Sequence, residues 1–477
     1  MTAGAISRRE FLALSGLSGL SVFLLDGCAP KSPRVSSTPA ADGQIAPRSV
    51  GQLIAQNTFL VAHRGSGDNW PEHTLEAYQQ SLAAGAQAVE ISVCATSDGV
   101  LVCHHDLSAK RVLGIDRNIA ELTWHELSEM YVDATRWLGV RTPLQPVARL
   151  DDVLKALGDD VLVFLEDKQG TNTAALLDMM DAQRRSTERF VWKQWARAGQ
   201  LTAAKSRGYM AWGYFEESDI DMVEAFASKF DILGVPVTMS DEAVTRAVAT
   251  NVPVMSWPVR FRDDRDRLLS LGVGGIMCAN VPYIGETVEV AVRDAFGTGR
   301  RAAGDLPSGI DEIGWYAQPV FVPEREALRI ERTGSCSYLL GSMTPNGQPE
   351  TTEIKVALRW PDALPASGTV GIAFALSGDG QGGDGGRGQA SGLELHLDAK
   401  GTLMLRERTE GQSGVVLATG GSLGCAIQNL YAVVSHTDHE RERRANAYRA
   451  DRSIRLFKTY ETAQAVEFSE LEVAITN

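Results

Sequence analysis

The sequence lacks the excess of basic residues that a nucleic-acid-binding protein carries. Its 477 residues include 46 Lys and Arg against 60 Asp and Glu, which gives a formal net charge of −14. Because affinity for a phosphate backbone depends on Lys and Arg, this balance excludes nucleic acid as a partner. It also excludes attraction to an anionic lipid surface by charge alone.

Three further absences narrow the class of protein. No Cys-x-x-Cys pair occurs among the six cysteines, which argues against a zinc site. No glycine-rich loop follows the first apolar run of the folded region, which argues against the common dinucleotide-binding fold. No run beyond residue 28 is long and apolar enough to cross a bilayer, which takes about 20 residues.

The N-terminal segment, residues 1–28, has the layout of an export signal. An arginine pair, Arg8-Arg9, precedes an apolar run that ends in small residues and Cys28. The order Ser-Arg-Arg-x-Phe-Leu resembles the twin-arginine type, and Leu-Leu-Asp-Gly-Cys resembles a lipobox. The resemblance implies an exported lipoprotein anchored to a membrane through Cys28, and the alternative is an ordinary signal cleaved nearby. Residues 29–48, rich in Pro, Ser and Ala, predict a flexible tether.

The cysteine count fits an oxidising compartment but does not define a disulfide framework. Five cysteines follow Cys28, and an odd count leaves at least one free thiol. Two pairings are compatible with the sequence, and spacing alone decides neither: Cys94 with Cys103, and Cys336 with Cys425.

Short apolar runs alternate with amphipathic stretches between residues 49 and 304. The runs predict eight strands, and Thr74 is the expected N-cap of the first intervening helix. This alternation indicates an α/β fold, a TIM-type (β/α)8 barrel, with an open doubly wound sheet as the alternative. Residues 107–150 interrupt this alternation of strands and helices, and they predict an insertion over one end of the barrel. The predicted strands are 58–63, 88–93, 161–166, 189–195, 209–215, 231–237, 252–257 and 274–280.

Residues 305–477 have a different pattern of apolar and polar residues. Alternating apolar and polar residues predict strands, and Asp-Ala-Lys-Gly at 398–401 between two such runs predicts a hairpin. We therefore expect an all-β antiparallel sandwich. This pattern of strands resembles the jelly-roll family of laminin-G and concanavalin-like modules, and the resemblance implies glycan binding. The alternative is that this region has a purely structural role.

Charged residues occur where the predicted barrel strands end. His63 and Arg64 end the first strand, and Glu166 ends the third, with Lys168 two residues later. Glu90 lies inside the apolar run of the second strand, and Ser92 shares its face because strand side chains alternate. The C-terminal ends of barrel strands converge on one mouth, so these groups are expected to meet there.

The residue types in this set suit a phosphodiester. Carboxylates hold a divalent cation, which neutralises charge on phosphoryl oxygens, while Arg and Lys bind the remaining oxygens. His63 and His105 are suited to move protons on opposite sides of phosphorus, because imidazole titrates near neutral pH. Taken singly, each residue also has an ordinary structural role, so the prediction depends on the joint arrangement.

Residues 61–106 carry a family resemblance. The ordered elements are His-Arg-Gly at 63–65, Pro-Glu-His-Thr at 71–74, Glu90-Ile-Ser92, Thr-Ser-Asp-Gly at 96–99 and His105-Asp106. With Glu-Asp-Lys at 166–168, they resemble the glycerophosphodiester phosphodiesterases. The resemblance implies an eight-stranded barrel, a divalent cation (Ca²⁺ or Mg²⁺) and two catalytic histidines. It implies these roles: His63 and His105 for proton transfer, Glu90 and Glu166 as metal ligands with Ser92 beside them, Arg64 and Lys168 for phosphate, and Glu72 in support.

The sequence departs from the family pattern at two of these positions. Ser92 stands where the family has a second metal-binding carboxylate, and His73 stands where it has asparagine. A hydroxyl is a weaker ligand for a hard cation than a carboxylate. Two glutamates still balance a dication, and water, His73, Asp106 or Asp167 are alternatives for the missing ligand.

Three hypotheses about function follow. The first is an exported, metal-assisted hydrolase of glycerophosphodiesters, lysophospholipids or related lipid and envelope phosphodiesters. The second is a catalytically impaired lipoprotein that binds a phosphate or glycan ligand at the cell envelope. The third is a phospholipase D-like enzyme that forms cyclic phosphates. Trp257, with Trp70 and Trp212, is a candidate for an apolar slot that binds the substrate, although core packing is an equally good interpretation.

Overall fold

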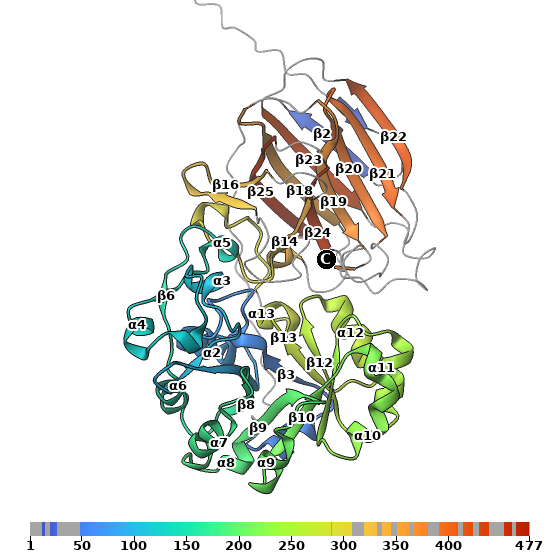
Figure 1. Ribbon diagram of the computed structural model, residues 1–477. Helices are drawn as coiled ribbons and strands as arrows, with labels where there is room; N and C mark the ends of the chain where they lie inside the picture. The colour runs from blue at the N-terminus through green and yellow to red at the C-terminus, as the bar shows by residue number, and fades with distance from the viewer. Residues whose placement is uncertain are drawn as a thin grey trace, which may run out of the picture.

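The computed structural model describes a barrel and a two-sheet region that lie side by side (Figure 1). The described residues are 12–14, 20–25, 48–287, 289–307, 319–331, 336–344, 351–362, 366–376, 378–379, 391–408, 414–422, 429–437, 453–459 and 464–476. Among them, no helix is both long and apolar enough to cross a membrane. The predicted tether, apart from Arg48, lies outside the described residues, and so does Cys28, the predicted site of lipid attachment.

All eight predicted barrel strands are present and parallel. Seven follow one another in the order β3-β13-β12-β11-β10-β9-β8, β4 comes next, and a β3–β4 pairing closes the barrel, so the open-sheet alternative is wrong. Side chains of β4 are buried along its whole length, as expected for strands covered on both faces. The strands are β3 (Phe59–Ala62), β4 (Ala88–Ala95), β8 (Leu162–Asp167), β9 (Phe190–Trp195), β10 (Met210–Tyr214), β11 (Ile232–Pro236), β12 (Val254–Val259) and β13 (Gly275–Cys278).

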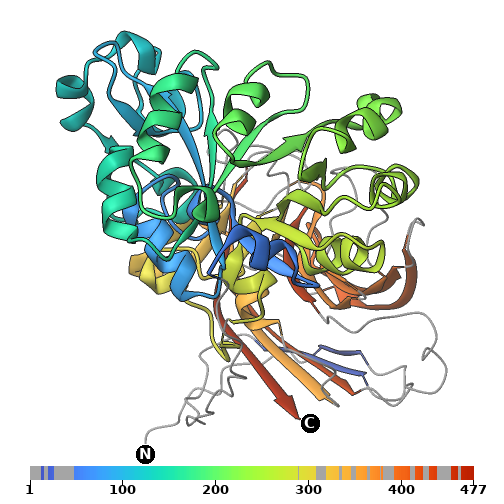
Figure 2. The same cartoon turned by 90° about the horizontal axis from the view of Figure 1, so that it is seen from below.

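Helices surround the barrel on its outer face (Figure 2). Ser49 caps the first helix, and its hydroxyl accepts from Gln52 N. Thr74 caps α2 in the same way, accepting from Ala77 N, and this confirms a prediction. The helices are α1 (Val50–Ile54), α2 (Leu75–Ala83), α6 (Leu150–Leu157), α7 (Thr173–Asp181), α8 (Ser186–Arg189), α9 (Leu201–Ser206), α10 (Val223–Ala227), α11 (Asp241–Val248), α12 (Arg262–Ser270) and α13 (Val281–Ile284).

The interruption at 107–150 forms a small lobe after β4 and its antiparallel neighbour β5 (Leu101–Cys103). A cluster of buried apolar residues joins the lobe to these strands, with Ile119, Leu122 and Leu127 packed with Cys94 and Val102. The lobe brings Arg111 and Trp137 to the mouth of the barrel, where the indole of Trp137 donates to Gly67 O at 3.0 Å. Its elements are α3 (Lys110–Leu113), α4 (Trp124–Ser128), β6 (Tyr131–Val132), α5 (Thr135–Leu138) and β7 (Gln145–Pro146).

The second half is an antiparallel sandwich, as predicted. One sheet has the order β1-β2-β23-β18-β25-β16-β15, and the other has the order β14-β17-β24-β19-β20-β21-β22. The predicted hairpin at 398–401 joins β20 and β21. Apolar residues of both sheets share one core, and the jelly-roll resemblance itself stays a prediction. The main strands are β18 (Thr351–Arg359), β19 (Thr369–Leu376), β20 (Gly392–Asp398), β21 (Thr402–Arg408), β22 (Val415–Ser422), β23 (Asn429–Thr437), β24 (Ser453–Lys458) and β25 (Val466–Thr476).

Shorter strands complete the two sheets. Within the segment predicted to be an export signal, β1 (Leu12–Leu14) and β2 (Leu20–Leu25) form strands, and β2 pairs with β23. The remaining strands are β14 (Leu306–Pro307), β15 (Val320–Val322), β16 (Ala327–Ile330) and β17 (Cys336–Leu339).

The sandwich contacts the barrel at the end where the barrel strands finish. The carboxylate of Asp379 accepts from the backbone nitrogens of Arg262 and Asp263 at 2.6 and 2.9 Å, and from the hydroxyl of Tyr283 at 2.8 Å. Arg262 and Tyr283 follow β12 and β13, so the sandwich borders the mouth of the barrel.

The structure excludes the disulfide between Cys94 and Cys103 that the sequence left open. Both are free thiols on adjacent antiparallel strands, where Cys94 is level with Val102 and Cys103 with Val93. Because neighbouring positions along a strand point to opposite faces, the two sulfur atoms project away from each other. Cys425 lies outside the described residues, so its pairing with Cys336 stays a prediction.

Candidate active site

Glu90 lies in the barrel interior because side chains alternate between the inner and outer faces of β4. Ala88 of β4 and Phe164 of β8 belong to the apolar cluster that fills the barrel, so Glu90 and Glu166, two residues further along each strand, face inward as well. Both glutamates are buried. Ser92 also faces inward, level with Glu166, and its hydroxyl donates to Glu90 Oε1 at 3.0 Å.

Lys193 of β9 pairs with both buried glutamates. Its Nζ lies 2.8 Å from Glu90 Oε1 and 2.7 Å from Glu166 Oε2. It follows the inward-facing Val191 by two positions, so the same alternation aims it into the barrel. The sequence analysis did not identify Lys193, although a lysine inside an apolar strand is the same signal that drew attention to Glu90.

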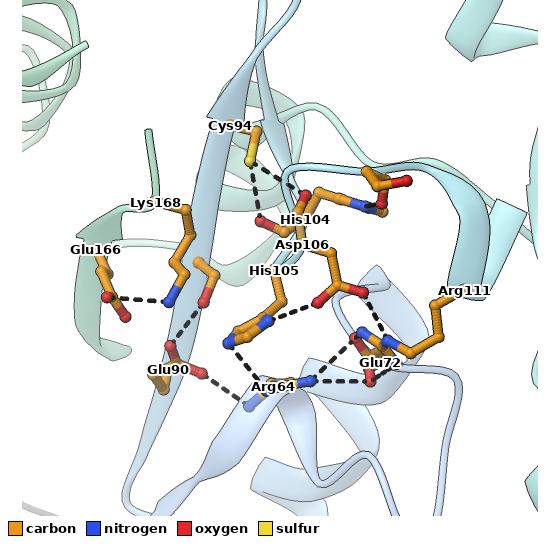
Figure 3. Close-up of polar contacts among 12 residues, drawn as sticks. Arg64, Glu72, Glu90, Cys94, His104, His105, Asp106, Arg111, Glu166 and Lys168 are labelled. Carbon is orange, nitrogen blue, oxygen red and sulfur yellow. Dashed lines mark hydrogen bonds and ion pairs between the residues drawn. The ribbon is translucent and has the colours of Figure 1, made fainter. Parts of the chain in front are cut away.

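The second oxygen of Glu166 is also engaged. Lys168 donates to Glu166 Oε1 at 3.1 Å, and the hydroxyl of Tyr214 donates to the same oxygen at 2.5 Å. Figure 3 shows Lys168 and Glu166 on one side of β4, with the histidine and arginine groups on the other. Tyr214 is a further residue that sequence reasoning missed.

These contacts fix the charge of each group. Burial alone would raise the pKa of Glu90, but Lys193 and His63 outweigh burial and hold that pKa well below its usual value. For Glu166, burial again acts upward, while Lys193 and Lys168 bring the pKa below its ordinary value. Burial would lower the pKa of Lys193, but Glu166 and Glu90 raise it above its ordinary value. The two carboxylates and the ammonium group are therefore all charged at neutral pH.

His105 is held by partners on both ring nitrogens. Its Nδ1 lies 2.8 Å from Asp106 Oδ1, and its Nε2 lies 2.9 Å from Arg64 Nη2 (Figure 3). A carboxylate accepts and a guanidinium donates, so the proton resides on Nδ1 and the lone pair on Nε2. Burial lowers the pKa of His105 well below its ordinary value, and Arg64 and Lys168 lower it further. His105 is thus a neutral imidazole with a basic Nε2.

Arg111 closes these contacts into a ring. Its Nε donates to Asp106 Oδ2 at 2.6 Å, and its two terminal nitrogens donate to Glu72 at 2.9 and 2.5 Å. Glu72 lies 3.5 Å from Arg64 Nη1, which completes a polar ring of Arg64, His105, Asp106, Arg111 and Glu72. Glu72 lies in this ring beside Arg64, and its supporting role stays a prediction. Arg111 could not be identified from the sequence because it comes from the irregular lobe.

His63 begins a tight turn, η1 (His63–Gly65), directly after β3. The turn places Arg64 N 2.9 Å from Glu90 Oε2, and Arg64 adopts a left-handed φ of 55°. Gly65, with φ of +77°, passes so close to α2 that a Cβ atom would lie 2.8 Å from Ala77 Cβ, so only glycine fits. Burial lowers the pKa of His63 well below its ordinary value, and the positive charge of Arg64 lowers this pKa further. The buried Nδ1 of His63 has no hydrogen-bond partner among the described residues.

The three side chains considered as alternatives to a carboxylate at position 92 are each held by other partners. His73 Nδ1 lies 2.8 Å from the hydroxyl of Tyr78, and Asp106 holds His105 and Arg111. Asp167 accepts from backbone nitrogens of the turn that follows β8, including Asn172 N at 2.8 Å. His73 has a left-handed φ of 57°, a conformation that both histidine and asparagine tolerate, which explains how it replaces the family's asparagine.

Aromatic side chains border the charged groups. The ring of Trp257 lies 5.1 Å from that of Tyr214, which in turn lies 5.4 Å from the ring of Trp195. These three rings are partly exposed, whereas Trp212 is buried in the barrel core. Core packing is therefore the correct interpretation for Trp212, and Trp257 stays a candidate for substrate contact.

The residues at this site do not fit a divalent cation in this arrangement. A hard cation takes six or more oxygen ligands, several of them charged, but Lys193 lies between the two glutamates and Ser92 directs its hydroxyl to Glu90. Within the described residues, no group of three or more His, Cys, Asp or Glu side chains is placed to hold a metal ion.

Comparison with known proteins matches residues 63–281 to the model of the Glycerophosphoryl diester phosphodiesterase family. Glycerophosphodiester phosphodiesterase from Caldanaerobacter subterraneus is 32% identical over 114 residues, which cover 24% of this chain and 46% of that protein. Glycerophosphodiester phosphodiesterase 1 from Mus musculus is 29% identical over 116 residues, which cover 24% of this chain and 35% of that protein. The chain thus spans less than half the length of these curated relatives.

Solved structures give the same likeness at low sequence identity. Glycerophosphodiester phosphodiesterase from Thermotoga maritima is 21% identical, with a TM-score of 0.40 over 48% of this chain and 98% of that chain. A phosphodiesterase of Oleispira antarctica, solved with the product sn-glycerol-3-phosphate, is 17% identical, with a TM-score of 0.42 over 48% of this chain and 95% of that chain. The family match over residues 63–281, with the closed barrel and the ordered motifs, shows that the barrel belongs to the glycerophosphoryl diester phosphodiesterase family.

Proposed function

We propose that the barrel hydrolyses a glycerophosphodiester at its mouth, with proton transfer by His105 and His63. The observation that carries the proposal is the neutral His105, whose Nε2 lone pair is aimed by Asp106 on the opposite nitrogen. A histidine oriented in this way by a carboxylate is suited to general-base catalysis.

Two cations are placed to bind the phosphodiester. The side chains of Arg64 and Lys168 are 16% and 19% exposed, whereas those of Arg111 and Lys193 are only 2% and 6% exposed. Arg64 and Lys168 can therefore reach a ligand in the mouth, and the buried pair holds carboxylates. Guanidinium and ammonium groups both form charge-assisted hydrogen bonds to phosphoryl oxygens.

Binding and proton transfer are linked through Arg64. In the free protein its guanidinium donates to His105 Nε2. When Arg64 turns to a phosphoryl oxygen, the lone pair of His105 is released to take a proton from water. The resulting hydroxide attacks phosphorus, and the bond from phosphorus to the leaving alkoxide breaks.

His63 donates the proton to the leaving alkoxide. It lies in the same turn as Arg64, and the negative charge of a bound phosphodiester raises its pKa from the low value that burial imposes. The products are an alcohol and a glycerol phosphate. The partly exposed rings of Trp257, Tyr214 and Trp195 give the leaving alcohol or acyl group an apolar wall.

Turnover of glycerophosphocholine and bis-p-nitrophenyl phosphate tests the proposal. We expect the full chain to hydrolyse both, and His105→Ala or His63→Ala to lose about 10²-fold or more in kcat, the usual contribution of a positioned proton-transfer group. His125→Ala is the matched control, because His125 is exposed on α4. Full activity in the double variant His63→Ala/His105→Ala would refute the proposed roles.

The other two hypotheses are distinguished by the same samples. Saturable binding of glycerophosphocholine without turnover would favour a binding protein, and a cyclic phosphate in the phosphorus NMR spectrum would favour the cyclising reaction.

We also propose, on the sequence of residues 1–28 alone, that the chain is exported and carries a lipid on Cys28. Metabolic labelling with a fatty acid, lost in Cys28→Ser, tests this. A glycan array probed with the full chain tests glycan binding by residues 305–477.

A further inference from the structure

Lys193 occupies the centre of the charged layer in the barrel mouth. Its position in β9 is level with Trp212 of β10, and its ammonium group lies 5.4 Å from the Trp212 ring centre and 5.5 Å from that of Tyr214. It is therefore enclosed by two rings on one side and by Glu90 and Glu166 on the other. A lysine with four carbons between backbone and charge reaches this centre from β9, which is separated from the strand of Glu90 by β8 alone.

Every oxygen of the two glutamates already lies beside a hydrogen-bond donor or a cationic group. Glu90 Oε1 accepts from Ser92 and Lys193, and Glu90 Oε2 accepts from Arg64 N. Glu166 Oε1 accepts from Lys168 and Tyr214, while Glu166 Oε2 lies 2.7 Å from Lys193 Nζ. A metal ion between the glutamates would have to displace Lys193, which contacts both.

Serine at position 92 belongs to the same arrangement. Ser92 and Glu90 are neighbours on the inner face of β4, and the hydroxyl donates to the carboxylate. A carboxylate at position 92 would instead place a third negative charge beside Glu90 and Glu166, which the two ammonium groups of Lys193 and Lys168 do not balance. Serine is thus the partner that suits a lysine, whereas an acidic residue is the partner that suits a dication.

The charge balance of the mouth supports this interpretation. The four carboxylates of Glu72, Glu90, Asp106 and Glu166 face the four cations of Arg64, Arg111, Lys168 and Lys193. The set is neutral, and adding a dication without removing Lys193 would leave an excess of two positive charges in a largely buried site. Uncompensated buried charge is costly, so the present set excludes such an addition.

We propose that the ammonium group of Lys193 takes the place of a divalent cation between Glu90 and Glu166, so that this barrel holds its phosphodiester without a metal ion. The part of the proposal that concerns cleavage rests on the proposed function. Lys193 fixes Glu90 and Glu166, which in turn hold Arg64 N and Lys168. Lys193 is accordingly a positioning residue for the two groups that bind phosphate.

Terbium luminescence of the full chain tests the proposal directly. Terbium(III) takes the oxygen ligands that calcium takes, and Trp212 and Tyr214 beside Lys193 would sensitise its emission. We expect no saturable emission from the wild-type protein, and turnover unchanged by EDTA. In the double variant Ser92→Asp/Lys193→Met, we expect saturable emission from one ion per chain that calcium displaces.

Controls separate the possible failures. Lys205→Met removes an exposed lysine that pairs with Asp231 on the outer surface, and it should leave the terbium titration unchanged. Near-UV circular dichroism checks that each variant is folded, and Lys193→Met alone provides a second titration if the double variant does not fold. The proposal would be overturned if the wild-type protein gave saturable emission that is lost both on addition of calcium and in the variant Glu90→Gln. It would also be overturned if both Lys193 variants were folded but bound no terbium. Absence of turnover in the wild-type protein would refute the proposed function but leave the terbium result to decide the role of Lys193.

Discussion

Arg64 Nη2 lies 2.9 Å from His105 Nε2, so the guanidinium covers the lone pair of the proposed base in the free protein. The same guanidinium lies 3.5 Å from Glu72, which Arg111 holds in place. Binding of a phosphoryl oxygen and release of the base therefore compete for one side chain. This relationship makes the orientation of His105, and the carboxylate that determines it, the first target for mutation.

Asp106→Asn is expected to lower kcat by about 10²- to 10⁴-fold with little change in KM. An amide can donate as well as accept, so His105 is no longer held with its proton on Nδ1 and its lone pair on Nε2. Steady-state kinetics with glycerophosphocholine measure the effect. Asp116→Asn is the matched control, because Asp116 is an exposed carboxylate that pairs with Lys110. An unchanged kcat in Asp106→Asn would show that this carboxylate does not orient the base.

The low pKa of His105 predicts the acid side of the pH profile. Burial, followed by Arg64 and Lys168, lowers that pKa below its ordinary value of about 6.5. A lowered pKa keeps the base unprotonated to lower pH, so kcat/KM should hold its plateau as the pH falls through 6.5 and decline only below it. A profile of kcat/KM against pH measures this, and an acid limb centred at or above 6.5 would contradict the orientation given to His105.

Arg111→Met should destabilise the barrel by about 3–5 kcal/mol, because it leaves buried Glu72 without its bidentate partner. Adding Glu72→Gln removes the unpaired charge, so Arg111→Met/Glu72→Gln should recover part of the loss. Urea unfolding followed by tryptophan fluorescence measures both variants. Equal free energies of unfolding for the single and double variants would show that the unpaired glutamate is not the cause.

Asp305, where the chain passes from the barrel to the sandwich, predicts a pH-dependent stability. Burial raises its pKa to about 7, although Ser342 donates to it from both its backbone nitrogen and its hydroxyl. The folded state thus holds a proton that the unfolded state releases near pH 4. The stabilisation is fully present below about pH 4 and is lost as the pH rises through about 7. Calorimetry should show a smaller decline in Tm between pH 5 and 8 for Asp305→Asn than for the wild-type protein, and parallel declines would contradict this origin.

The sequence was sufficient to predict the barrel because its strands are short apolar runs with helical stretches between them. It also predicted that Glu90 and Ser92 share a face, since side chains alternate along a strand, and that Glu166 lies at the end of its strand. The same rule applied to the predicted strand 189–195 would have identified Lys193, which was overlooked because it does not end its strand. Arg111 was beyond reach, since no periodic pattern fixes the path of the lobe that carries it. Cys94 and Cys103 were considered as a disulfide because sequence spacing does not reveal the face to which each side chain points.

The most direct test of hydrolysis at phosphorus is phosphorus NMR of glycerophosphocholine turnover in water enriched in oxygen-18. The account predicts an open glycerol phosphate that carries one oxygen-18 atom, seen as an isotope shift of the phosphorus resonance, and no such product from His105→Ala. A cyclic phosphate, or a glycerol phosphate without oxygen-18, would show that water activated by His105 does not attack phosphorus.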